Sequence, residues 1–193
     1  TTFVGHPVIK FDMASVNGIE FRERYGLESS GPLLCVLPGS RKGEIRRHLK
    51  PFREAVQLLQ VSRPNISVVI PTISTLKDEI IRAVSSWDVN VIVVEGIASK
   101  YSAMAASNVA LAASGTVALE LALARVPSVI AYKVNIITSW IIRFLISGKY
   151  VNLINILLNK EAVPEFLQVE CNGKNLAESI DNLLKDPKTY KAQ

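Results

Sequence analysis

Apolar and polar positions follow two patterns along this chain: short, continuous apolar runs and longer segments with one apolar face. Short runs rich in β-branched residues predict buried strands of a parallel sheet, at residues 33–37, 67–70, 90–94, 108–112 and 128–132. Residues 44–61 place apolar side chains on one helical face, and shorter helices are predicted over 76–86, 98–106 and 116–125. This alternation predicts an α/β fold, a Rossmann-like parallel sheet with helices on both faces.

The last third of the chain has a different pattern. Residues 134–147 are apolar and aromatic with one charge, Arg143, and this run is shorter than the ~20 residues of a membrane span. Lys133 and Lys149 flank it. Three interpretations stay open: a packed helix, a contact with a partner such as a second copy, or a helix at a membrane interface. A final helix is predicted over 176–185.

Composition and charge narrow the function. With 193 residues, 49% of them hydrophobic, the chain can bury the core of one domain, which excludes disorder. The net charge of +5 favours anionic partners. The basic residues are not interleaved with aromatic ones, so nucleic acid is not an expected partner. Cys35 and Cys171 match no metal-site spacing, and we expect reduced thiols, no metal and no cofactor. The start at Thr1, without an initiator Met, suggests a fragment.

The first candidate site follows the first predicted strand, in the segment LPGSRKGEIRR (residues 37–47). Ligands of parallel sheets bind beyond the carboxyl ends of strands, where this segment falls. Gly39 allows close backbone approach, Ser40 is a suitable helix cap, and Arg41 can bind phosphate oxygens with its guanidinium group. The segment matches neither the P-loop nor the GxGxxG pattern, so an ordinary βα turn remains the alternative.

The second candidate site is Ser114-Gly115-Thr116, between a predicted strand and a predicted helix. Free N–H groups and the positive end of the helix dipole would suit a pyrophosphate there. Glu120, about one turn inside the helix, could accept hydrogen bonds from a ribose diol. The alternative for Glu120 is a carboxylate that faces solvent.

Polar residues also interrupt the apolar stretch 151–168. Asn155, Glu165 and Gln168 either contact a ligand or hold a buried turn. His6, which precedes Pro7, is a lone histidine, and it is either structural or a proton carrier.

Several of these segments together resemble one family. FVGHP (3–7), LPGSRKGEI (37–45), ASGTVALELAL (113–123), AYK (131–133) and N…VPEFLQ (155–168) match the lipid-A-disaccharide synthases in order and spacing over nearly the whole chain. These are bacterial glycosyltransferases of GT-B architecture, and the resemblance implies their C-terminal, nucleotide-sugar-binding half. Residues 1–20 would be the crossover from a missing N-terminal domain, and residues 21–150 the UDP-sugar-binding domain. Residues 151–193 would complete the site and cross back.

The resemblance also implies an activity. The family transfers 2,3-diacylglucosamine from its UDP derivative to 2,3-diacylglucosamine 1-phosphate, which releases UDP and forms the β-1,6 disaccharide of lipid A. It implies a peripheral enzyme on the cytoplasmic side of the inner membrane of Gram-negative bacteria. Arg41 would stabilise the departing UDP, with His6 as a second catalytic candidate, and the general base would lie in the other half. The implied donor-binding residues are Gly39, Ser40, Arg41, Glu44, Ser114, Gly115, Thr116, Glu120, Lys133, Asn155, Glu165 and Gln168.

Two other functions fit parts of the sequence. The first is another UDP-sugar enzyme of the same architecture, an epimerase or a UDP-GlcNAc transferase, which would bind a soluble sugar nucleotide as well as an acylated one. The second is a non-catalytic module that binds a membrane surface or a partner, which would bind liposomes through 134–149 and show no saturable UDP binding.

Overall fold

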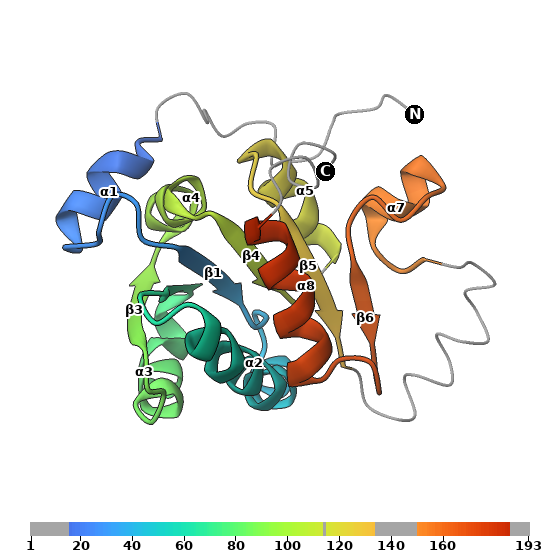
Figure 1. Ribbon diagram of the computed structural model, residues 1–193, viewed down its shortest axis with the longest axis horizontal. Helices are drawn as coiled ribbons and strands as arrows, with labels where there is room; N and C mark the ends of the chain where they lie inside the picture. Colours follow the sequence, from blue (N-terminus) through green and yellow to red (C-terminus); the bar gives the residue numbers. More distant parts are fainter. Residues whose placement is uncertain (1–15, 114, 134–149, 186–193) are drawn as a thin grey trace.

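A computed structural model describes residues 16–113, 115–133 and 150–185 (Figure 1). One parallel sheet of six strands, in the order β3-β2-β1-β4-β5-β6, forms its centre. The strands are β1 (Leu33–Leu37), β2 (Ser67–Thr72), β3 (Asn90–Glu95), β4 (Val109–Ala112), β5 (Ser128–Tyr132) and β6 (Glu165–Leu167). The helices are α1 (Gly18–Arg24), α2 (Lys42–Ser62), α3 (Ser74–Val84), α4 (Ile97–Ala106), α5 (Gly115–Leu123), α7 (Leu153–Leu158) and α8 (Gly173–Lys185).

Helices cover both faces of the sheet because alternate residues of each strand point to opposite sides. Leu34 and Val36 of β1 belong to the core cluster formed with α2, α3 and α8. Leu33, Cys35 and Leu37 of the same strand belong to the second cluster, formed with α1, α4 and α5. The predicted α/β sheet with helices on both faces is therefore confirmed.

The strand order places a switch point between β1 and β4. From β1 the chain proceeds outward through β2 to β3, and then returns to the other side of β1 as β4. The segments that leave β1 and β4 therefore diverge, and the region outside the carboxyl ends of these two strands, called the crevice below, is where open parallel sheets bind their ligands. Ala113 N–H still donates to Leu37 O at 2.9 Å, so the two strands stay paired up to this crevice.

Three elements, α1, α7 and β6, were not predicted from the sequence. Helix α1 begins where the side chain of Asn17 accepts hydrogen bonds from Ile19 N–H at 3.0 Å and Glu20 N–H at 3.2 Å. Strand β6 has three residues and pairs with β5, with Ile130 opposite Glu165. Because β6 joins the same sheet and α8 contributes to the first core cluster, residues 150–185 continue the layered domain.

The apolar run 134–147 lies outside the described residues, and so does most of the expected crossover segment 1–20. Within the part of the chain that the structure describes, no helix is long and apolar enough to cross a membrane.

Candidate functional site

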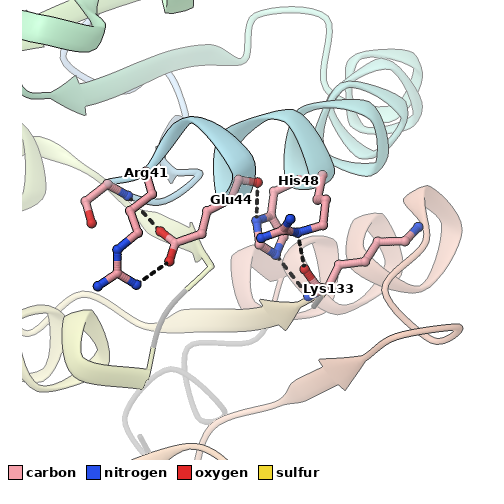
Figure 2. A network of polar contacts seen from close by, with 6 residues as sticks. Arg41, Glu44, His48 and Lys133 are labelled. Carbon is pink, nitrogen blue, oxygen red and sulfur yellow. Dashed lines mark hydrogen bonds and ion pairs between the residues drawn. The ribbon is translucent and has the colours of Figure 1, made fainter. Parts of the chain in front are cut away.

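The loop between β1 and α2 borders the crevice, and its shape depends on one carboxylate (Figure 2). Gly39 adopts φ +120°, a conformation that disfavours any residue with a Cβ atom. Glu44, in the first turn of α2, accepts from Ser40 N–H at 3.1 Å and from Arg41 Nη1 at 3.2 Å. The carboxylate thus folds back over the loop that precedes its own helix.

The expected cap of α2 differs in the structure. The N-cap residue is Arg41 and not Ser40, and Arg41 makes no side-chain cap hydrogen bond. Glu44 instead binds the backbone just before the helix, as the glutamate of a capping box does. The Arg41 side chain is 83% exposed, so its guanidinium group is accessible to an anion in the crevice.

Lys133 lies directly after β5, and its backbone connects this strand to α2. Its N–H donates to His48 Nε2 at 2.9 Å, and its carbonyl accepts from Arg47 Nε at 3.1 Å. Both partners lie on the second turn of α2, so the segment after β5 is held against the helix that follows the loop of Arg41 (Figure 2). His48 is not among the site residues predicted from the sequence, although its position on the same apolar helical face as Ile45 and Phe52 could have indicated a buried polar role.

The second predicted turn leads from β4 into α5, which begins at Gly115. Ser114 lies outside the described residues, as do the side chains of Gly115 and Thr116. Glu120 of α5 is 15% exposed and forms an ion pair with Lys100 of α4. Its Oε1 lies 3.3 Å from the Tyr101 hydroxyl, and burial followed by the charge of Glu120 raises the pKa of that hydroxyl. Glu120 therefore packs between two helices and is not the solvent-facing carboxylate of the alternative reading.

Asn155 is completely buried and holds a turn. Its Nδ2 donates to Val163 O at 2.7 Å, and its Oδ1 accepts from Ala162 N–H at 2.8 Å and Val163 N–H at 2.9 Å. The sequence left two interpretations open for Asn155, a ligand contact or a buried turn, and these hydrogen bonds are those of a buried turn.

Glu165 and Gln168 lie at either end of β6. The Glu165 carboxylate accepts from Val151 N–H at 3.1 Å and from Asn152 N–H at 2.7 Å. Gln168, with φ +51°, donates its N–H to Tyr132 O at 2.8 Å. Gln168 thus lies beside the end of β5, near the edge that carries Lys133.

The structure therefore gathers the loop of residues 39–44, the start of α5, Lys133 and Gln168 along the carboxyl edge of the sheet. His6 lies outside the described residues. Among the residues that are described, no cluster of three or more His, Cys, Asp or Glu side chains could hold a metal ion.

Comparison with known proteins identifies the family. The model of the lipid-A-disaccharide synthetase family matches residues 1–193. The chain belongs to the lipid-A-disaccharide synthase family. It is similar to the lipid-A-disaccharide synthases of Rhodospirillum centenum, with 45% identity over 100% of this chain, and of Paramagnetospirillum magneticum, with 48% identity over 96%. It spans 48% of the length of each of these relatives.

Solved structures share the fold of this family member. The C-terminal domain of a group 1 glycosyl transferase from Francisella tularensis aligns with a TM-score of 0.61 and 18% identity, over 98% of this chain and 93% of that domain. UDP-GlcNAc 2-epimerase from Neisseria meningitidis aligns with a TM-score of 0.60 and 16% identity, over 90% of this chain and 42% of the epimerase. The family resemblance and the Rossmann-like fold expected from the sequence are both confirmed.

Proposed function

We propose that this chain is the donor-binding half of a lipid-A-disaccharide synthase. The reaction would transfer 2,3-diacylglucosamine from UDP to 2,3-diacylglucosamine 1-phosphate. One observation carries the proposal: family segments far apart in the sequence, 37–45, 113–123 and 131–133, meet at the carboxyl ends of β1, β4 and β5. A nucleotide bound at the switch point of such a sheet would contact all three.

The chemistry of this half is stabilisation of the leaving group. Negative charge develops on the β-phosphate of UDP as the glycosidic bond breaks. Hydrogen-bond donors that are already oriented towards this phosphate stabilise the transition state and so lower the activation barrier. The exposed guanidinium of Arg41 and the N–H groups at the starts of α2 and α5 are such donors. Glu120 would accept from the ribose, and Gln168, which follows the carboxyl end of β6, would lie on the uridine or sugar side. The base that deprotonates the acceptor would come from the other half of the enzyme, with His6 as a further candidate.

A membrane surface is the partner that the substrates require, because both carry acyl chains. On α7 the side chains of Leu153, Ile156, Leu157 and Leu158 are 38–69% exposed, and the chain carries a net charge of +5. Apolar side chains combined with positive charge favour binding to anionic lipid. We therefore place the enzyme peripherally on the cytoplasmic face of the inner membrane.

Calorimetric titration of this chain with UDP tests the donor site. We expect saturable binding, and a loss of about tenfold or more in Arg41→Ala and Glu120→Ala, since a hydrogen bond to a charged group contributes about 1.5–3 kcal/mol. Arg82→Ala on α3 and Glu178→Ala on α8 are matched controls at exposed positions away from the crevice. No UDP binding by the folded chain, or equal losses in the controls, would contradict the proposal.

The donor sugar separates this function from that of another UDP-sugar enzyme. A synthase half should bind UDP-2,3-diacylglucosamine more tightly than UDP-GlcNAc, because acyl chains add apolar contacts. Equal affinities would favour an epimerase or a UDP-GlcNAc transferase. Liposome binding without UDP binding would favour a surface-binding module.

A further inference from the structure

His48 is a buried histidine that borders the candidate site without facing the crevice. It lies on the second turn of α2 and is 2% exposed. Its ring is 5.6 Å from that of Phe52 and 6.5 Å from that of Tyr132, measured between centroids. A polar ring in this position must satisfy both of its nitrogens, since an unpaired buried donor or acceptor is costly.

The partners of His48 determine which nitrogen carries the proton. A backbone N–H can only donate, so Nε2, which receives Lys133 N–H at 2.9 Å, is the unprotonated nitrogen. The proton is then on Nδ1, which donates to Glu44 O at 2.8 Å. The neutral Nδ1–H form uses both nitrogens, and the charged form would set a second N–H against that of Lys133.

These two hydrogen bonds join parts of the sheet that do not touch directly. Strands β1 and β5 are separated by β4 in the sheet. His48 nevertheless links the first turn of α2, which follows β1, to the residue after β5, and Arg47 adds a bond to the same residue. The Glu44 backbone held by His48 carries the carboxylate that shapes the loop at Ser40 and Arg41. One imidazole therefore couples the two loops that border the crevice (Figure 2).

We propose that neutral His48 is a positioning residue for donor binding, which holds the loop of residues 39–44 and the backbone of Lys133 in the arrangement that receives the diphosphate, and that protonation of His48 weakens this site. This role of His48 depends on the donor site proposed above. In that site His48 would not contact the substrate itself.

The surroundings of His48 define the direction of the pH effect. In the described structure the charged and titratable groups around the ring are Glu44 and Arg47 on α2 and Tyr132 and Lys133 at the end of β5. Burial, and to a smaller extent the charge of Arg47, lowers the pKa of His48 below its ordinary value of 6.5, against the opposing effects of the Glu44 and Pro38 carbonyls and the Glu44 carboxylate. The ring is therefore neutral at pH 7.5 and takes up its proton at a lower pH than a free histidine does.

The experiment measures UDP-GlcNAc affinity between pH 5.0 and 7.5 for this chain and three variants. UDP-GlcNAc is suitable because its diphosphate does not titrate in this range. His48→Gln keeps an acceptor for Lys133 N–H, and His48→Leu removes both bonds. Leu59→Ala on the same helix is the matched control, since Leu59 is 1% exposed and three turns from His48, so its loss lowers stability only.

We expect wild-type affinity to fall towards pH 5.0 as His48 takes up a proton. His48→Gln should bind within about threefold of wild type at pH 7.5, with no pH dependence. His48→Leu should bind about tenfold more weakly at every pH, whereas Leu59→Ala should keep the wild-type profile with a lower Tm. Nitrogen-15 NMR should show Nδ1 protonated and Nε2 unprotonated in one of the two histidines at pH 7.5.

Two outcomes would overturn this role and leave the donor site intact: an affinity that stays constant over a pH range in which NMR shows His48 becoming protonated, or wild-type affinity in His48→Leu. An NMR spectrum in which neither histidine is in the Nδ1–H form would overturn it even if His48→Leu failed to fold. No binding by folded wild type at pH 7.5 would instead overturn the donor site, and with it the role of His48.

Discussion

At the scale of single residues, Gly39 is the position where the loop of the site depends most on the absence of a side chain. Its φ is +120°, and an added Cβ would lie 2.7 Å from both Cβ and Oε2 of Glu44. Gly39→Ala should therefore lower the free energy of unfolding by about 2–4 kcal/mol, from backbone strain and steric overlap together. Because Glu44 must move, UDP affinity should fall as well. Urea denaturation and calorimetry measure the two effects.

Gly26→Ala is the control for this substitution. Gly26 also has a positive φ, +63°, but an added Cβ would meet nothing within 4 Å. We expect a loss of about 1 kcal/mol from strain and unchanged UDP affinity. If both variants lost the same stability and kept the same affinity, the contact between Gly39 and Glu44 would not control the loop.

The sequence predicted the positions of single site residues in the sheet but not the contacts of their side chains. The motifs predicted that Gly39, Arg41 and Glu120 lie at one edge of a sheet, because strand ends in a parallel sheet share that edge. They did not predict that Glu120 pairs with Lys100, because that contact depends on how two helices pack. The role of Asn155 was not predicted either. A polar residue in an apolar stretch suggested a ligand contact, but the three hydrogen bonds of its side chain close a local turn.

At the scale of elements, α2 and α8 approach each other closely at Gly173, the first residue of α8. An added Cβ there would lie 2.4 Å from Glu54 Cβ and 3.0 Å from the Glu54 backbone carbon. Arg63 and Asp181 also join the two helices, with Nε and Oδ1 2.8 Å apart. Gly173→Ala must separate the helices, so we expect a loss of about 1–3 kcal/mol in unfolding free energy. Thermal and urea denaturation would measure it.

Gly43→Ala provides the comparison within α2. An added Cβ at Gly43 would meet only the end of the flexible Arg47 side chain, at 3.4 Å. Since alanine is the better helix former by about 0.5–1 kcal/mol, this variant should be as stable as wild type or slightly more stable. A Gly173→Ala variant as stable as Gly43→Ala would refute the close approach of α2 and α8.

Elements were predictable from sequence in proportion to their apolar pattern. Strands β1 to β5 are continuous apolar runs and helix α2 has a long apolar face, and the existence and type of these elements were predicted within a few residues. Helix α1 buries only Phe21, and β6 has three residues, too few to show a period of two. Their formation depends on the Asn17 cap and on pairing with β5, and neither signal is strong in one sequence.

At the scale of the whole molecule, the alternation of strands and helices predicted the fold class, and the family motifs predicted the architecture. The strand order was not predicted, because a sequence does not show on which side of β1 the fourth strand pairs. That choice creates the crevice between β1 and β4. It also separates β5 from β1, so the connection between their loops passes through His48 and Arg47.

Buried titratable groups in both core layers make the stability of the whole domain depend on pH at both ends of the range. Burial lowers the pKa of His48, so the unfolded chain binds more protons near pH 6, and the free energy of unfolding should decrease as the pH falls below 6.5. Burial raises the pKa of Cys35 to about 12 and that of Cys171 to about 11, so the folded chain binds more protons above pH 9. Stability should therefore also decrease as the pH rises above 9, by about 1.4 kcal/mol per pH unit for each thiol that ionises only on unfolding.

Urea denaturation from pH 5 to 10.5 would measure both slopes. His48→Gln should remove most of the acidic slope and keep the alkaline one, and Cys35→Ala should reduce only the alkaline slope. If each variant changed both slopes equally, the pH dependence would come from the net charge of the molecule and not from these buried groups.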